Sequence, residues 1–198
     1  MKITGHVTTT KYWIIGLLMA LGAGASPVRA QDARTAGPHH GTRSGEQSGN
    51  ALVNIVRQST ERFRDVSVAM AEGYALAFGC VSGPDWGAMG MHFVNMPLVG
   101  DGEIDVARPE IVIYEPLPDG RLRLIGADYL VFADAWHARH AGTPELKGQL
   151  LHLFEAPNRF GLPAFYTLHV WAWKENPNGT FVNWHPGVSC DGFNGPGQ

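Results

Sequence analysis

The clearest pattern of apolar positions lies between residues 52 and 70. Apolar side chains recur there at spacings close to three and four, at Leu52, Ile55, Val56, Phe63, Val66 and Met70. Charged residues such as Arg57 and Asp65 stand between them, which is the pattern of an amphipathic helix. An interruption is expected near Ser59 and Thr60, and Gly73 is placed to close the helix. The apolar stripe must be buried, and Phe63 is expected to be among its most buried residues.

After Tyr74 the pattern changes to short β-like runs separated by turn residues. We count six or seven of them, at residues 74–78, 88–94, 110–114, 121–131, 150–154, 165–173 and 180–184. Pro118-Asp119-Gly120 and residues 176–179 (Asn-Pro-Asn-Gly) are typical of tight turns, so the strands that they join are predicted to be antiparallel. The longer connection at residues 133–148 is predicted to be a loop or a short helix.

Together these elements predict an α+β fold. The N-terminal amphipathic helix packs on a strongly curved antiparallel sheet, or on a small barrel, of six to seven strands. Residues 51–198 form the single α+β domain of this interpretation, as the length of the chain favours one domain.

The first 50 residues lack this organisation and divide into two parts. Lys2 and Lys11, an apolar run over residues 12–25 and the small-residue site Val28-Arg29-Ala30 indicate a cleavable signal peptide at residues 1–30. A membrane anchor is the alternative, but the run is interrupted by glycine and falls short of the roughly 20 residues that span a bilayer. Residues 31–50 are polar and glycine-rich, which predicts a flexible leader.

Composition narrows the class of partner. The signal carries three basic residues and no acidic one, so 15 basic residues fall to 12 against 18 acidic ones and the net charge changes from −3 to −6. Nucleic acid is therefore not an expected partner, because phosphate binding requires a concentrated basic surface. Later apolar runs are broken by charges, glycine or proline, so no integral membrane association is expected after cleavage. We expect a periplasmic or secreted protein.

Cys80 and Cys190 are the only cysteines. An exported protein meets an oxidising compartment, so a disulfide bond between them is the simplest interpretation. One reactive thiol and one buried thiol are the alternative, which would need an activating histidine or lysine nearby.

Two histidines and one acid stand on otherwise apolar faces of three predicted strands. His92 alternates with Gly90 and Val94, and His169 shares a face with Trp171. Asp128 alternates with leucines and Gly126 along the fourth run. If the sheet curves around one core, all three side chains point inward and need a partner, which a metal ion or one another could supply.

Two imidazoles and one carboxylate form a set that holds a divalent metal with open coordination positions. Zinc, copper or iron suits this set better than calcium or magnesium. Glu110, Glu115 and His152 are candidate additional ligands. A bound metal with open positions could activate water or oxygen, so whether the chain is an enzyme stays open.

Three other interpretations are compatible with the same residues. The histidines and the acid could form a polar network without chemistry, or lie apart. The chain could be a non-catalytic module whose aromatic-lined cavity takes a small molecule, although core packing also explains Trp171, Trp173 and Trp184. It could also be a structural envelope protein. No motif of serine hydrolases, HExxH zinc proteases, thioredoxin-like enzymes or nucleotide-binding loops is present.

Several short stretches resemble a known family. They are Gly87-Ala88-Met89-Gly90-Met91-His92-Phe93-Val94-Asn95, Arg108-Pro109-Glu110, Tyr114-Glu115-Pro116, His169-Val170-Trp171 and Val188-Ser189-Cys190. In these stretches the chain is similar to an uncharacterised family of exported bacterial proteins, over residues 60–190. The resemblance implies a bacterial envelope location and no particular activity, substrate or catalytic residue.

Overall fold

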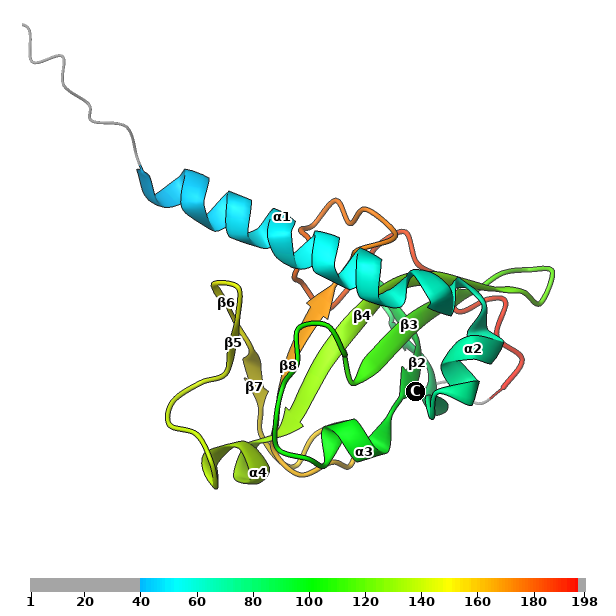
Figure 1. Ribbon diagram of the computed structural model, residues 1–198. Helices are drawn as coiled ribbons and strands as arrows, with labels where there is room; N and C mark the ends of the chain where they lie inside the picture. Colours follow the sequence, from blue (N-terminus) through cyan, green and yellow to red (C-terminus); the bar gives the residue numbers. More distant parts are fainter. Residues whose placement is uncertain (1–39, 196–198) are drawn as a thin grey trace, which may run out of the picture. The chain divides into compact units, whose positions relative to one another are not determined.

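The computed structural model describes residues 40–195, whose centre is a six-stranded antiparallel sheet (Figure 1). The strand order is β1-β2-β3-β4-β8-β7. The strands are β1 (Ala75–Gly83), β2 (Gly87–Val94), β3 (Ile111–Pro116), β4 (Leu122–Phe132), β7 (His152–Phe154) and β8 (Phe165–Val170). The sheet is curled into a half-barrel, which confirms the α+β class with a strongly curved antiparallel sheet. The predicted signal peptide and residues 31–39 of the leader lie outside the described residues.

The helical segment has three pieces rather than one. Helix α1 spans His40–Thr60, a 3-10 turn η1 spans Glu61–Arg64, and α2 spans Val66–Ala71. The break follows from Asp65, which adopts an extended backbone and accepts a hydrogen bond from the Ser67 amide at 2.9 Å as the N-cap of α2. Helix α1 also begins earlier than predicted, so residues 40–50 of the expected leader are helical. Gly73, with φ of 94°, closes the segment as predicted.

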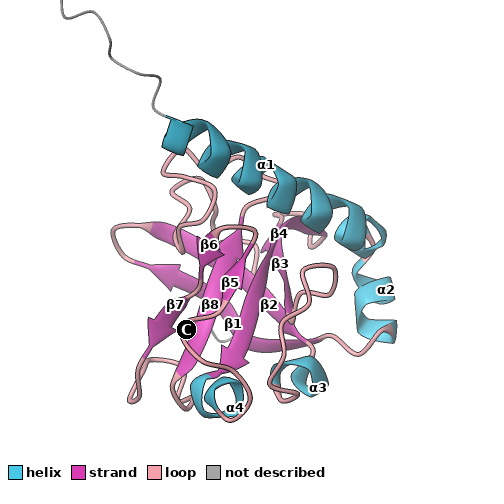
Figure 2. Cartoon of the chain, turned by 60° about the vertical axis from the view of Figure 1, so that its left-hand side comes forward, coloured by secondary structure: helices cyan, strands magenta, loops and turns pink. Residues whose placement is uncertain are grey.

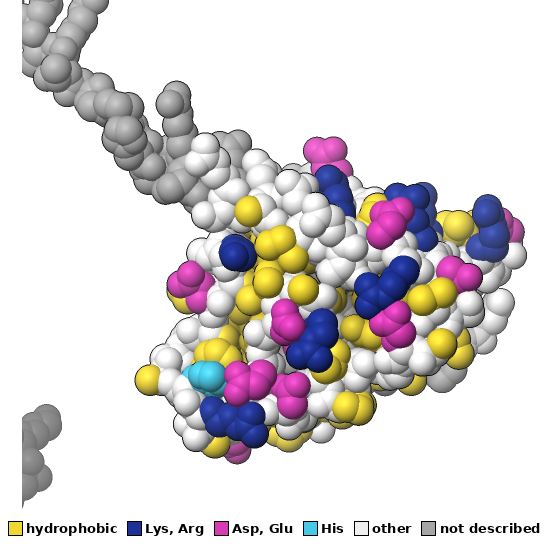
Figure 3. Space-filling view, in the orientation of Figure 1, with side chains coloured by type: hydrophobic (Ala, Val, Ile, Leu, Met, Phe, Trp, Pro, Cys, Tyr) yellow, Lys and Arg dark blue, Asp and Glu magenta, His cyan; other side chains and the backbone are white. Residues whose placement is uncertain are grey.

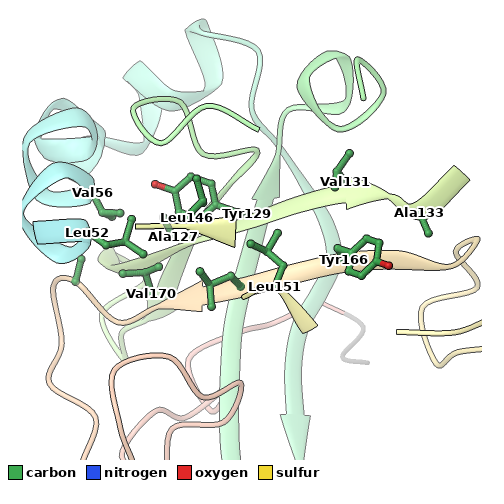
Figure 4. Packing of buried hydrophobic residues seen from close by; sticks show 12 residues of the cluster. Leu52, Val56, Ala127, Tyr129, Val131, Ala133, Leu146, Leu151, Tyr166 and Val170 are labelled. Atoms are coloured by element: carbon green, nitrogen blue, oxygen red, sulfur yellow. The ribbon is translucent and has the colours of Figure 1, made fainter. Parts of the chain in front are cut away.

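The helical segment covers one face of the sheet. Leu52 and Val56 of α1 are fully buried against β4 and β8, where they meet residues such as Ala127 and Val170 (Figures 2 and 4). Phe63 is 1% exposed and packs with β2 and β3 on the same face. Met70, assigned to the same stripe from the sequence, is 58% exposed. The extended backbone at Asp65 interrupts the helix, so the apolar spacing of α1 does not continue into α2.

The opposite, inner face of the sheet has its own apolar cluster. Val94, Ile111, Leu130 and Phe165 are among its buried members. Alternation along β4 places Asp128 and Leu130 on this inner face and Ala127 and Tyr129 on the helix-covered face. Polar groups on the inner face are therefore surrounded by apolar side chains.

The connections agree only partly with the sequence prediction. The turn at Pro118-Asp119-Gly120 joins β3 to β4, and Leu117 and Arg121 are hydrogen-bonded across it. The short helices α3 (Met96–Val99) and α4 (Ala133–His137) follow β2 and β4, and β5 (Glu145–Leu146) and β6 (Gln149–Leu150) form a separate hairpin. Within residues 40–195, no helix is both long and apolar enough to cross a membrane.

The predicted last strand at residues 180–184 does not form. This segment is irregular: Thr180 accepts a backbone hydrogen bond from the Trp171 amide, and His185, just beyond the segment, forms an isolated bridge with Ala88 in β2. Asn183, Pro186 and Gly187 disfavour a regular strand here, and proline cannot donate to a ladder. The predicted disulfide is present between Cys80 in β1 and Cys190, whose Cα atoms lie 5.8 Å apart.

The visible surface is mixed in charge. In the orientation of Figure 1, basic and acidic side chains are interspersed (Figure 3). Exposed ion pairs of the described residues include Arg62 with Glu72 at 2.6 Å and Arg108 with Asp105 at 2.9 Å. This face offers no concentrated basic surface to a polyanion.

Candidate metal centre

The three predicted residues converge on the inner face of the sheet. One potential ligand atom from each of His92, Asp128 and His169 lies within 4.8 Å of those of the other two. All three side chains are buried, with residue exposures of 2–5%. Among the side chains that the structure describes, this is the one such group of histidine, cysteine and acidic residues.

Strand register explains the convergence. Asp128 of β4 and His169 of β8 are direct cross-strand partners, and Ile111 of β3 lies on the other side of Asp128 in the same row. His92 pairs with Ile113 of β3, which is two residues from Ile111 and faces the same side of the sheet. His92 therefore lies in the neighbouring row of inward-facing side chains. The curl of the sheet brings the His92 imidazole over β3 towards the other two residues.

The His92 ring is held in one orientation by its own strand. Its Nδ1 lies 3.1 Å from the Gly90 carbonyl oxygen, which can only accept a hydrogen bond, so Nδ1 carries the proton. The unprotonated Nε2 then faces His169 Nε2 at 3.4 Å. A ligating histidine that donates its other N–H to a backbone carbonyl is the usual arrangement around protein-bound metals.

Gly90 is required for this arrangement. Its φ is 94°, and a Cβ at this position would lie 2.7 Å from the Tyr114 carbonyl oxygen. Glycine thus allows the backbone of β2 to approach β3 and to present its carbonyl to His92.

His169 has no satisfactory hydrogen-bond partner. Its Nδ1 is buried and unpaired, because the nearest acceptor, Asp128 Oδ1, is 3.6 Å away. Its Nε2 contacts only the Nε2 of His92, at a distance that is long for a hydrogen bond. Buried polar atoms are normally paired, so this histidine is the unusual member of the group.

Asp128 is better satisfied. Its Oδ1 accepts a hydrogen bond of 2.6 Å from the Thr167 hydroxyl, which is contributed by β8. Thr167 was not among the predicted residues, although it alternates with His169 and this parity could have revealed it. The bond leaves the carboxylate oriented towards the two imidazoles.

Burial decides the charge states of the group. It lowers the pKa of His92 to about 4, with a further contribution from His169, and lowers the pKa of His169 to about 3. Burial raises the pKa of Asp128 to about 6, against the opposing effect of the Thr167 hydrogen bond. Both imidazoles are therefore neutral at pH 7, so His169 and Asp128 do not form an ion pair despite their proximity. Neutral imidazole is the form that binds metals.

The three candidate additional ligands are not part of this group. Glu110 is buried nearby, and its Oε2 accepts a hydrogen bond from the Leu130 amide at 3.0 Å. Glu115 pairs with Arg123 and, at 2.8 Å, with Lys174. Burial alone would raise the pKa of Glu115, but these two partners hold it below its ordinary value. His152 is exposed on the edge strand β7.

A small cavity of about 30 Å³ adjoins the three residues. Besides His92, Asp128, His169, Thr167 and Asn183, its wall is apolar, and four of its side chains are phenylalanines at positions 78, 154, 160 and 165. The tryptophans considered from the sequence do not line it. Trp171 is buried in the inner cluster, and Trp184 lies in a surface groove with Trp86.

Phe78 reaches the cavity because of an irregularity in β1. The register of β1 against β2 shifts between Ala77 and Cys80, and Phe78 and Gly79 both have φ of 65°. Such a bulge redirects a side chain, and a positive φ at phenylalanine is costly. The redirected ring packs edge-on against Phe160 at 5.5 Å.

Comparisons of this chain with protein-family models, with curated proteins and with solved structures give no match.

Asn183, like Thr167, is a polar residue of the cavity that was not among the predicted residues. Its Oδ1 is buried without a hydrogen-bond partner. It lines both the cavity and the neighbouring surface groove of about 400 Å³, which also contains His152 and Trp184. Asn183 was assigned to a strand that does not form, so alternation could not place it.

Proposed function

We propose that this chain is an exported protein that binds one divalent transition metal ion through His92, Asp128 and His169. The observation that carries the proposal is the convergence of three buried ligand atoms, from three strands, to within 4.8 Å of one another. Two imidazoles and one carboxylate suit zinc, copper or iron.

The spacing of the two imidazoles supports a metal between them. Nitrogens bound at about 2.0–2.1 Å in a tetrahedral site lie roughly 3.3 Å apart. The two Nε2 atoms are separated by 3.4 Å. Only a small adjustment of the rings would therefore be needed to place an ion between these atoms.

The proton positions of the metal-free group support the same conclusion. If His169 carries its proton on Nδ1, the lone pairs of two Nε2 atoms face each other at 3.4 Å. If it carries the proton on Nε2, the Nδ1 lone pair faces Asp128 Oδ1, which repels it when ionised. Each neutral arrangement leaves one buried contact unfavourable. A cation between the nitrogens removes the conflict of the first arrangement.

The first arrangement also defines a role for the carboxylate. With Nδ1–H of His169 directed at Asp128, the carboxylate would orient the imidazole and strengthen it as a ligand. Alternatively, Asp128 would turn away from Nδ1 and bind the ion itself. Two protein ligands in the first case, or three in the second, leave coordination positions open.

Export is the second part of the proposal. The signal-like residues 1–30 and the Cys80–Cys190 pair both suit an oxidising compartment outside the cytoplasm. The resemblance to exported bacterial proteins favours the bacterial envelope or secretion.

The test is the metal content of the exported protein, purified from the periplasm without an affinity tag. His39 and His40 are replaced by alanine in every sample, so that this adjacent pair cannot bind metal. Elemental analysis, followed by titration of the stripped protein with Zn²⁺, Cu²⁺ and Fe²⁺, gives the stoichiometry and the affinity. We expect one ion per chain.

Variants locate the ion. His92→Ala and His169→Ala are each expected to weaken binding by more than the roughly 10–100-fold typical of groups that only orient a ligand. His152→Ala is the matched control, since this histidine is in the same sheet but exposed, and it should bind as the parent does. Stoichiometric uptake that survives both His92→Ala and His169→Ala would refute the site. No uptake by the folded parent would favour the metal-free alternative, a small-molecule-binding module.

A further inference from the structure

We infer that the open coordination position of the metal faces the aromatic-lined cavity and takes a small neutral diatomic molecule, of the class of dioxygen or nitric oxide. This inference rests on the proposed metal site and extends it to the ligand. It depends on three properties of the cavity: its position, its size and the chemistry of its wall.

Position links the cavity to the metal. His92, Asp128 and His169 all line it, so the polar end of the cavity is the ligand group itself. An ion held by these residues would have protein on the strand side and the cavity as the adjoining free space. An exogenous ligand would therefore bind from the cavity.

Size limits the ligand to very few atoms. The free volume is about 30 Å³, whereas a single water needs roughly 10–15 Å³ on a comparable measure. Two or three non-hydrogen atoms fit, and an organic substrate does not fit without movement of the wall.

The wall favours a neutral ligand. An anion bound at the metal would need hydrogen-bond donors to replace its hydration. Thr167 already donates to Asp128, and Nδ1 of His92 already donates to Gly90. With Nδ1–H of His169 directed at Asp128, the Asn183 amide is the one lining group left to donate, and the remaining wall is phenylalanine, leucine, isoleucine and methionine.

Access is available at one side of the cavity. Phe78, Phe154, Phe160 and Leu162 are only partly buried, whereas the wall residues contributed by β2, β3, β4 and β8 are buried. Asn183 separates the cavity from the open groove that contains His152 and Trp184. A diatomic molecule can reach the metal through small side-chain movements, without opening of the sheet.

The experiment uses the full exported chain loaded anaerobically with Fe²⁺, and nitric oxide as the probe. Electron paramagnetic resonance detects a ferrous nitrosyl, and titration gives its dissociation constant. Azide is titrated in parallel as an anion of similar size. We expect one nitric oxide per iron and no azide complex at concentrations where nitric oxide saturates the site.

Two variants test the position of the ligand. Leu162→Trp fills the cavity, and we expect nitric oxide to bind at least about tenfold more weakly with iron uptake unchanged. Leu153→Trp is the matched control on the neighbouring strand, where the native side chain is 47% exposed and outside the cavity, and it should bind as the parent does.

The outcomes separate the two proposals. If the parent takes up no iron, both proposals fail. If it binds iron but not nitric oxide, or binds azide equally well, only the inference about the ligand fails. If Leu162→Trp loads with iron and binds nitric oxide as the parent does, the open position does not face this cavity. The titrations of the unmodified protein decide the question even if Leu162→Trp does not fold.

Discussion

Glu110 provides a test of the fold that is independent of any metal. It directly precedes β3, and its side chain is buried, with 2% of the residue exposed. The Leu130 amide donates to Oε2 at 3.0 Å, and within residues 40–195 no lysine, arginine or histidine forms an ion pair with the carboxylate. Burial therefore raises the pKa of Glu110 to about 8, the two backbone hydrogen bonds only partly oppose this, and the nearby Asp128 adds to it.

This shift predicts the sign of a pH effect on stability. The carboxyl group holds its proton in the folded protein up to a pKa of about 8 but releases it near 4.5 when unfolded. Between these values the folded state binds more protons, so stability falls as pH rises through this window. The stabilising proton is fully present below the unfolded pKa and lost above the folded one.

The magnitude follows from the separation of the two pKa values. One pKa unit corresponds to about 1.4 kcal/mol, so the loss between pH 4.5 and pH 7 is about 3 kcal/mol. Glu110→Gln removes the ionisation and keeps a carbonyl oxygen for the Leu130 amide. The variant should therefore match the parent near pH 4 and exceed it by about 3 kcal/mol at pH 7.

The assay is equilibrium unfolding in urea, with the disulfide intact, at half-unit steps from pH 4 to pH 9. The difference between the parent and Glu110→Gln isolates this group from Asp128 and the histidines, which titrate in both proteins. Glu155→Gln, at an exposed position, is the control and should follow the parent. Parallel curves for the parent and Glu110→Gln between pH 5 and pH 8 would show that Glu110 is hydrated or paired, against the structure.

Three further predictions concern packing, the disulfide and the ligand set. Phe63→Ala should cost about 3–5 kcal/mol in urea unfolding, because the ring is fully buried under the helical segment; a cost below about 1 kcal/mol would contradict this packing. Replacing Cys80 and Cys190 by alanine should cost roughly 4–5 kcal/mol, because the bond closes a loop of 110 residues; thiol titration of the native exported protein should find no free thiol, and two would exclude the bond. Thr167→Val should weaken metal binding about 10–100-fold with the fold retained; unchanged affinity would mean that the hydroxyl does not orient Asp128.

The inward face of the ligand residues was predictable from alternation, but their convergence was not. His92, Asp128 and His169 each alternate with small or apolar residues, and strand parity places such residues on the inner face of one curled sheet. Alternation along a strand shows on which face of the sheet a side chain lies, but it does not show which residues of the neighbouring strands lie beside it. The same reasoning could not exclude Glu115 or His152, because their partners and exposure depend on Lys174, Arg123 and the position of β7 at the edge.

The last segment of the chain shows a second limit. Residues 180–184 have the composition of a strand, yet they are irregular and are hydrogen-bonded to Trp171 through Thr180 and Val182. Asn183 lines the cavity together with residues such as His92 and Asp128, which are far away in the sequence. The cavity wall contributed by Asn183 was therefore outside the reach of local patterning.

Local patterns in the sequence were enough to predict the α+β class, the antiparallel pairing at the Pro118-Asp119-Gly120 turn, the cysteine pair and the inward face of the three polar residues. These features depend on short-range periodicity, on turn chemistry and on the presence of two cysteines in a chain expected to be exported. The strand order, the bulge that redirects Phe78 and the 3.4 Å approach of the two imidazoles could be read only from the folded chain. Each of these depends on the register and curl of the whole sheet, because a shift of one residue in one strand would turn its side chains to the other face.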